Sequence, residues 1–196
     1  MRAHVRLSSI IVVFFVALDQ YTKYLVRANL RMRERIEVIP GFFNLTHLEN
    51  PGAAWGILGD NEYRLVFFTV ITLVAFIVLI GYFRQLKPDE RTMACALSLI
   101  FAGALGNFID RLSPRHTVTD FLDFYASGAA APIVRKLIGS AHWPAWNVAD
   151  GCISVGVTLF IIHILFLENR TPNPEDKDAP APLTPDAQEA SEPAES

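Results

Sequence analysis

The sequence predicts an all-α polytopic membrane protein with four transmembrane helices. Three observations favour this class: 52% of the 196 residues are hydrophobic, only 19% are charged, and the apolar residues gather in four long runs. A helix that crosses a bilayer core needs about 20 predominantly apolar residues. A soluble domain of this length has too little interior to bury four such runs, and a disordered chain would be far less hydrophobic.

The four expected helices span about residues 7–26, 65–83, 93–112 and 148–167. The second is the clearest, because Leu65 to Phe83 contains no charged residue. The first follows Arg2 and Arg6, as the apolar core of a signal peptide would. However, Asp19 to Lys23 stands where a cleavage site would carry small residues. We therefore expect the first helix to be retained.

Four helices would place both termini on one side of the membrane and two longer loops on the other. In the first loop, Ile36 to Leu48 is rich in β-branched and aromatic residues and contains a Pro40-Gly41 turn, which predicts a small β cradle at the membrane surface. In the second loop, Ala126 to His142 is small and apolar around Arg135-Lys136. It is either an amphipathic segment lying on the membrane or a plain connector.

The segment 171–196 differs from the rest of the chain. It holds seven acids, one base and six of the twelve prolines, a net charge of −6, whereas the remainder carries +3. We expect a transmembrane domain over 1–170, followed by a disordered, acidic, Pro-rich tail. Lysines and arginines number seven on the terminal side and nine on the other, so charge counting leans slightly toward termini outside the cell.

Polar residues gather where three of the four spans reach the same face of the membrane. They are Asp19 and Lys23 at the end of the first span, Asn107, Asp110 and Arg111 at the end of the third, Asn147 and Asp150 at the start of the fourth, and Asp120 in the preceding loop. Ionisable groups in membrane helices are costly and are a functional hypothesis by default. The i,i+4 spacing of Asp19 and Lys23, with the acid first, favours an ion pair. In a purely structural interpretation, Asp19–Lys23 and Asp110–Arg111 are ion pairs that hold helices together. Small residues are expected to let the third and fourth spans approach: Ala102, Gly103, Ala104, Gly106, Gly151 and Gly156.

Asp120 and Asp150 have no base within the next four residues. Two carboxylates that lie close together cannot both ionise and so share one proton, which suits general acid–base hydrolysis of an amide. The chain has no GxSxG motif and no Cys/His spacing typical of zinc, so no metal or cofactor is expected.

Two other functional classes fit the polar cluster. A small ion-coupled transporter would use intramembrane acids to move protons, but these acids crowd one face and do not form a relay across the bilayer. In a non-enzymatic membrane assembly factor, the same groups would only lock helices together. Nucleic acid is not an expected partner.

Five segments in order resemble the motif set of the lipoprotein signal peptidases (signal peptidase II), bacterial membrane aspartyl proteases. They are Asp19-Gln20-Tyr21-Thr22-Lys23, Glu49-Asn50-Pro51-Gly52-Ala53-Ala54-Trp55, Gly103 to Arg111, Val118-Thr119-Asp120-Phe121, and Trp146-Asn147-Val148-Ala149-Asp150. Two features depart from the family pattern: the stretch Ala126 to His142 looks like an insertion, and Trp146 stands where many relatives have Phe.

The resemblance implies an endopeptidase that cleaves prolipoproteins before a diacylglyceryl-modified cysteine. It implies Asp120 and Asp150 as the catalytic dyad. The supporting or substrate-binding positions would be Asp19, Lys23, Asn50, Gly52, Asn107, Asp110, Arg111 and Asn147. It further implies a monomer in contact with lipid in the bacterial inner membrane, with both termini cytoplasmic and the two large loops and active site periplasmic, against the lean of charge counting.

Overall fold

The computed structural model describes residues 3–52 and 63–167. The end of the second motif, Ala53 to Trp55, and the tail 171–196 lie outside the described residues. The chain divides into two units, Met1–Ile161 and Ile162–Ser196. The described part of the second unit comprises the last residue of a helix and a π-helical segment, His163–Leu167.

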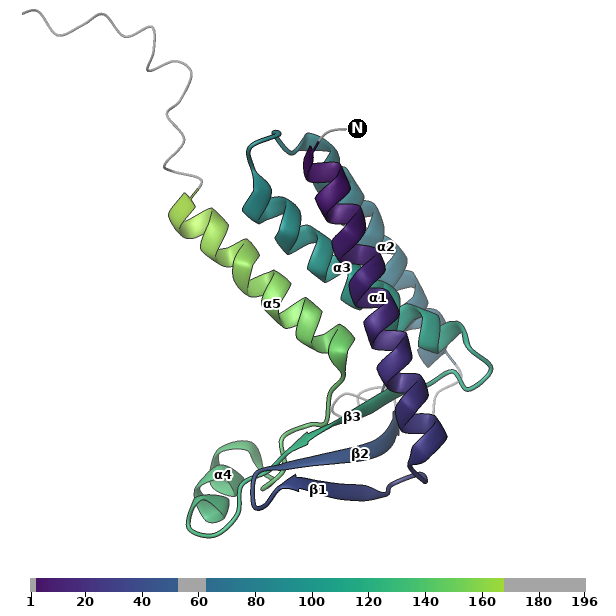
Figure 1. Ribbon diagram of the computed structural model, residues 1–196, viewed down its shortest axis with the longest axis vertical. Helices are drawn as coiled ribbons and strands as arrows, with labels where there is room; N and C mark the ends of the chain where they lie inside the picture. The colour runs from purple at the N-terminus through teal and green to yellow at the C-terminus, as the bar shows by residue number, and fades with distance from the viewer. Residues whose placement is uncertain (1–2, 53–62, 168–196) are drawn as a thin grey trace, which may run out of the picture. The chain divides into compact units, whose positions relative to one another are not determined.

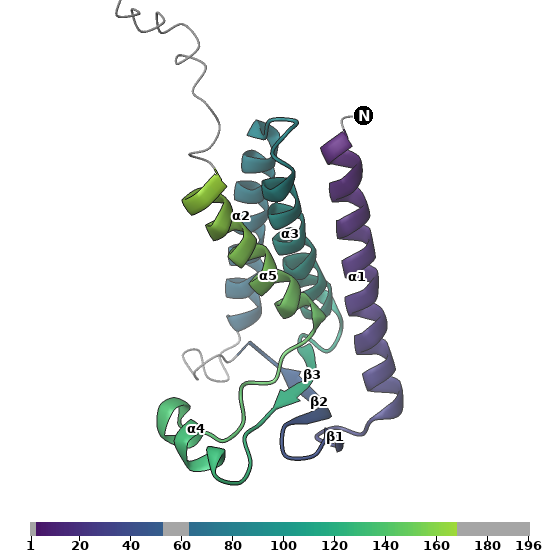
Figure 2. The same cartoon turned by 60° about the vertical axis from the view of Figure 1, so that its left-hand side comes forward.

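Within the described residues, four helices are long and apolar enough to cross a membrane, which confirms the expected number. They are α1 (Ala3–Asn29), α2 (Arg64–Gln85), α3 (Arg91–Leu112) and α5 (Val148–Ile162), the last continuing into the π-helical segment. Helices α1, α2 and α3 run side by side (Figures 1 and 2). Helix α2 buries no residue against the protein, as befits an apolar helix that faces lipid.

Small residues bring α3 and α5 into close contact, as expected. A Cβ atom added to Gly103 on α3 would overlap the carbonyl oxygen of Ala149 on α5. A Cβ atom on Gly156 of α5 would lie 2.8 Å from the carbonyl oxygen of Ala96 on α3. Gly151 was wrongly included in this interface, because its nearest neighbour is the Trp146 ring.

A three-stranded antiparallel sheet lies at the end of the helices opposite the N-terminus of α1 (Figure 1). Its strands are β1 (Arg35–Ile39), β2 (Phe43–Asn50) and β3 (Val118–Phe124), in that order. Strands β1 and β2 form the expected hairpin, and Gly41 provides the left-handed turn between them with φ 76°. The third strand was not anticipated, and the all-α part of the expected class is not confirmed.

The second loop contains a short helix, α4 (Ala130–Ile138), which ends at Gly139 in the left-handed conformation. At helical spacing, Ile133 and Leu137 lie on one face, and Arg135 and Lys136 lie on another. The two apolar side chains are 63% and 77% exposed, so they do not pack against the protein. The segment is therefore an amphipathic helix and not a plain connector. That it lies on the membrane stays a prediction.

Candidate active site

The start of α5 is built as a capping box. The side-chain oxygen Oδ1 of Asn147 accepts a hydrogen bond from the backbone N–H of Asp150 at 3.0 Å, and Asp150 Oδ2 accepts one from the backbone N–H of Asn147 at 3.2 Å. This reciprocal arrangement satisfies donors that the first turn of a helix leaves unpaired. It also fixes the half-buried Asp150 carboxylate at the N-terminus of α5, where the helix dipole favours negative charge.

Asp120 lies on β3 opposite Leu48 of β2 and is only 4% exposed. Its Oδ1 accepts a hydrogen bond from Asn147 Nδ2 at 2.7 Å, and its Oδ2 accepts one from Asn50 Nδ2 at 3.0 Å. Burial raises the pKa of Asp120 to about 6. The nearby charge of Asp150 adds to this rise, which the two amide donors partly offset.

Two asparagines connect the acids. Asn147 contacts Asp120 through its side chain and Asp150 through its backbone N–H. Asn107 on α3 donates from Nδ2 to Asp150 Oδ1 at 2.8 Å, and its Oδ1 accepts from Asn147 Nδ2 at 3.3 Å. The structure therefore brings Asp120 and Asp150 into one hydrogen-bonded cluster, although they come from a strand and a helix 30 residues apart.

Lys23 is the buried cation behind this cluster. It is completely buried, and its Nζ lies 2.9 Å from Asp19 Oδ2, 2.8 Å from Asp110 Oδ2 and 2.9 Å from Asn107 Oδ1. The predicted pair Asp19–Lys23 is present. Asp110, however, pairs with Lys23 and more distantly with Arg27 (3.7 Å), both on α1, and forms no ion pair with Arg111. The predicted pair of Asp110 with its sequence neighbour is wrong.

Arg111 faces α2, whereas its sequence neighbour Asp110 faces α1. Its guanidinium carbon lies 5.0 Å from the centre of the Phe68 ring on α2, a cation–π geometry. Its Nη1 donates to the backbone carbonyl of Asn107 at 3.3 Å, while its buried Nε has no hydrogen-bond partner. The charges of Asp150 and Asp120 act on this guanidinium, so Arg111 belongs to the same electrostatic cluster.

Asn50 is held by a tight turn at the end of β2. Its Oδ1 accepts a hydrogen bond from the backbone N–H of Gly52 at 2.8 Å, which leaves Nδ2 free to donate to Asp120. Gly52 has φ 90°, and a Cβ atom there would meet the Phe68 ring at 2.5 Å. The position thus requires glycine both for its backbone conformation and for space.

Asp19 connects α1 to α3 and α5 together with its neighbour Gln20, a residue of the first motif that was not predicted to have a role. Asp19 Oδ1 accepts from the backbone N–H of Ala149 on α5 at 2.9 Å. Gln20 Nε2 donates to Asp19 Oδ2 and to the carbonyl oxygen of Gly106, both at 3.1 Å. A long amide inside an apolar run was the signal in the sequence that could have identified Gln20.

Glu49, Thr119 and Arg27 form a second set of contacts that sequence reasoning missed. Thr119, next to Asp120, accepts from Arg27 Nη1 at 3.0 Å and donates to Glu49 Oε1 at 3.0 Å. Burial by itself would raise the pKa of Glu49, but hydrogen bonds from Thr117, His47 and Thr119 outweigh it and lower this pKa. These contacts hold β3 against β2 and α1 and so fix the strand that carries Asp120.

A cavity of about 920 Å³ opens beside Asp120. Asn50 and Pro51 line it from the end of β2, and Ile138, at the end of α4, and Trp143, in the loop that follows, line it from the second loop. The volume suits an extended peptide segment or part of a lipid. Among the described residues, no group of three or more His, Cys, Asp or Glu side chains is placed to hold a metal ion.

Comparison with known proteins decides the family. The sequence profile described as signal peptidase (SPase) II matches residues 11–166, which include Asp19, Lys23 and both candidate acids. The chain belongs to the signal peptidase II family. Because this family consists of aspartic peptidases, the chain is an aspartic peptidase. It is also a membrane protein with several apolar helices that cross the membrane.

Other members resemble the chain along most of its length. A lipoprotein signal peptidase of Geobacter metallireducens is 40% identical over 170 residues, which cover 87% of this chain and 97% of the relative. One of Staphylococcus aureus is 39% identical over 171 residues, 87% of this chain and 93% of the relative. Two solved structures, each described as a bacterial membrane enzyme, superpose with TM-scores of 0.67 and 0.70 at 38% and 37% identity. They match 83% and 86% of this chain and 94% of each solved chain.

Proposed function

We propose that this signal peptidase II removes signal peptides from prolipoproteins by cleaving before a diacylglyceryl-modified cysteine, with Asp120 and Asp150 as the catalytic dyad. The observation that carries the assignment is Asn147, which hydrogen-bonds both carboxylates and so holds them in one cluster. The relatives named lipoprotein signal peptidases support the choice of substrate.

The two acids divide the chemistry according to their surroundings. Asp120 is the more buried, and its pKa of about 6 makes it the better holder of the shared proton. Asp150 is only half-buried, so water can reach it, and its carboxylate accepts two hydrogen bonds, from Asn107 and from the Asn147 backbone. We therefore assign Asp150 as the general base and Asp120 as the general acid.

In the first step, a water oxygen attacks the scissile carbonyl carbon. Asp150 takes a proton from this water, while Asp120 donates its proton to the carbonyl oxygen. In the second step, the tetrahedral intermediate collapses: the C–N bond breaks, Asp150 gives its proton to the departing amine, and Asp120 recovers its proton as the carbonyl re-forms. Both acids return to their starting states without a covalent intermediate.

The supporting residues act through these acids. Asn107 and Asn147 orient the dyad, and Lys23 holds Asn107 through a hydrogen bond to its Oδ1. Asn50 keeps its amide on Asp120 because Gly52 closes the turn. These are positioning roles, since the side chains contact the dyad and each other.

We further propose that the peptidase domain occupies 1–170 and acts as a monomer in the inner membrane, with the acidic tail 171–196 outside it. In this arrangement both termini are cytoplasmic, the active site lies at the periplasmic face, and the lipid chains of the substrate face the bilayer. The sheet and the cavity beside Asp120 lie together at one end of the spans, which supports an active site at a single membrane face. The resemblance to the family supports the periplasmic side for this face.

The test is cleavage of a synthetic diacylglyceryl-modified precursor by the purified protein, with and without a chelator. Asp120→Asn and Asp150→Asn should each lose activity by at least about 10²-fold, the lower end of what one general acid or base contributes. Asp123→Asn is the matched control, because Asp123 is a buried acid on the same strand that contacts Asn44 and His142 instead of the dyad. Normal cleavage by either dyad variant would sink the assignment.

The rival classes give different outcomes in the same preparation. A transporter would show substrate-linked proton uptake and no cleavage by the wild type. An assembly factor would show a lower melting temperature in both variants and again no wild-type cleavage.

A further inference from the structure

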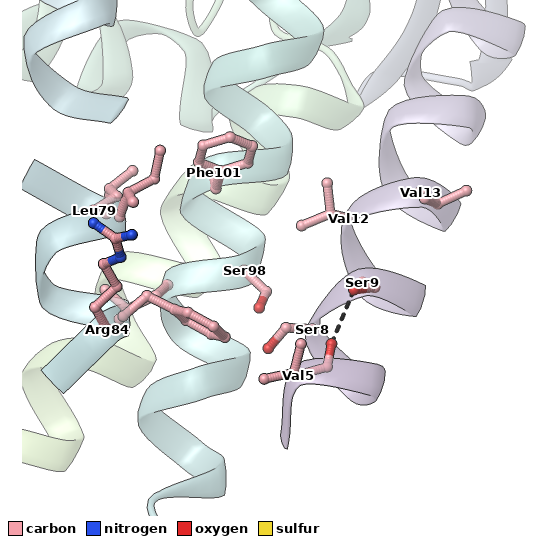
Figure 3. Close-up of a pocket in the computed structure, with 12 residues that line it drawn as sticks. Val5, Ser8, Ser9, Val12, Val13, Leu79, Arg84, Ser98 and Phe101 are labelled. Atoms are coloured by element: carbon pink, nitrogen blue, oxygen red, sulfur yellow. Dashed lines mark hydrogen bonds between the residues drawn. The ribbon is translucent and has the colours of Figure 1, made fainter. Parts of the chain in front are cut away.

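A second cavity lies near the N-terminus of α1, at the opposite end of the bundle from the candidate active site. Figure 3 shows the residues that line it. It has a volume of about 340 Å³ and is walled by α1, α2 and α3. About 15 residues separate Ser8, in its wall, from Lys23 along α1, which corresponds to about 22 Å at the helical rise. The cavity is therefore separate from the dyad and from the cavity beside it.

One polar side chain in this wall is buried and unpaired. Ser8 is only 6% exposed, and its hydroxyl has no hydrogen-bond partner. Serines in apolar helices usually donate to the carbonyl four residues earlier. The neighbouring cavity residues Ser9 and Ser98 do so, to Val5 at 2.9 Å and to Ala94 at 2.6 Å.

The Ser8 hydroxyl points from α1 across the cavity toward Ser98 on α3 (Figure 3). Because the Ser9 and Ser98 hydroxyls already donate to their own helices, Ser8 is the hydroxyl among the described lining residues whose proton has no acceptor. A buried donor without an acceptor is unfavourable. A ligand that fits the site should therefore present an acceptor oxygen between apolar walls.

We propose that this cavity binds one acyl chain and the adjoining ester group of an anionic glycerophospholipid. The ester carbonyl is an acceptor without a proton of its own, which matches Ser8. Val12, Leu79 and Phe101 supply apolar surface for the acyl chain, and the Arg84 guanidinium, beside Leu79 on the α2 wall, is the cation for the phosphate (Figure 3).

The charge of this end of the bundle selects an anionic headgroup. The exposed cations around the cavity mouth and the α2–α3 loop are Arg6, Arg84, Lys87 and Arg91, against the two acids Asp89 and Glu90. Clusters of basic residues at a membrane surface attract anionic lipids. A helical peptide fits less well, because its carbonyl oxygens are used by its own backbone hydrogen bonds.

The experiment is lipid titration of the full-length protein in detergent, read by native mass spectrometry in the absence of peptide substrate. The probes are ester-linked phosphatidylglycerol, its ether-linked analogue and ester-linked phosphatidylcholine. We expect wild type to bind ester-linked phosphatidylglycerol most tightly. Ser8→Ala should weaken that binding about 2–10-fold, the usual worth of one hydrogen bond, without affecting the ether analogue.

Matched variants test each contact. Ser98→Ala removes a hydroxyl whose proton stays within α3 and should leave lipid binding unchanged. Arg84→Gln should weaken phosphatidylglycerol more than phosphatidylcholine, and by more than Arg91→Gln does, because Arg84 lines the cavity and Arg91 does not. Val12→Phe fills the acyl volume and should weaken binding of all three probes.

Three results would overturn the proposal. The first is equal binding of ester and ether lipids by wild type, and the second is a Ser8→Ala protein that binds like wild type. The third is displacement of the lipid by an unlipidated signal peptide whose own binding depends on Ser8, since the occupant would then be the peptide. None of these readouts requires cleavage, so they are independent of the proposed peptidase activity.

Discussion

Replacing Lys23 with methionine should destabilise this protein more than any surface substitution. Methionine matches the length of the lysine stem but removes the ammonium group that meets Asp19, Asp110 and Asn107 at 2.8–2.9 Å. Both carboxylates are at most 2% exposed, so water cannot replace the lost cation. Two buried acids would then face each other, and the cation left beside them would be Arg27, at the longer distance of 3.7 Å from Asp110 Oδ1.

The size of the effect follows from that burial. Removing one partner of a buried ion pair costs about 3–5 kcal/mol, because the remaining charge stays desolvated. For a chain of this length, each kcal/mol lowers the melting temperature by about 2–4 °C. Lys23→Met should therefore melt about 6–20 °C below wild type. Adding Asp110→Asn should recover part of the loss, because it removes one of the two stranded charges.

The assay is thermal unfolding of the detergent-solubilised proteins, with both single variants and the double variant in one cycle. Lys87→Met, at an exposed lysine in the α2–α3 loop, is the control and should melt within about 2 °C of wild type. The reasoning is refuted if Lys23→Met melts like the control. It is also refuted if Asp110→Asn destabilises the Lys23→Met background as much as it does wild type, since the charges would then be uncoupled.

Three further predictions concern the site and its supports. Because the folded-state pKa of Asp120 is raised to about 6, stability should fall as pH rises from about 4 to about 6, and the melting temperature of Asp120→Asn should not share this fall. Gly103→Ala should push α3 away from α5, which should lower the free energy of unfolding by about 1–3 kcal/mol and with it the melting temperature and the cleavage rate. Gly81→Ala is the control and should be neutral, because a Cβ atom there would have nothing within 4 Å. Gly52→Ala should reduce the cleavage rate more than Gly128→Ala, because both have positive φ but only Gly52 also lacks space for a Cβ atom.

The membrane class and the number of spans could be predicted from the sequence, because they depend on composition and run length. An apolar stretch such as Leu65 to Phe83 must leave water whatever surrounds it. The hairpin at Pro40-Gly41 was predictable for a similar reason, since its turn and flanking residues are local. The Asp19–Lys23 pair is four residues apart on one helix, a spacing that places two side chains side by side.

Strand β3 could not be predicted in this way. It pairs with β2, about 70 residues earlier, so its hydrogen-bonding partner is absent from its own neighbourhood in the sequence. Its two buried acids, Asp120 and Asp123, also argue against a strand in any prediction from the sequence, because Asp is uncommon inside strands.

The partners of the charged groups were likewise decided only by tertiary structure. Adjacent helical residues point about 100° apart, so Asp110 faces Lys23 on α1 while Arg111 faces Phe68 on α2. The sequence by itself determined which acids are present, that the chain crosses the membrane, and which residues match the family motifs. Which carboxylates are neutralised by Lys23, and which two are left to share Asn147, depended on helix and strand packing, because that packing sets which groups meet after water is excluded.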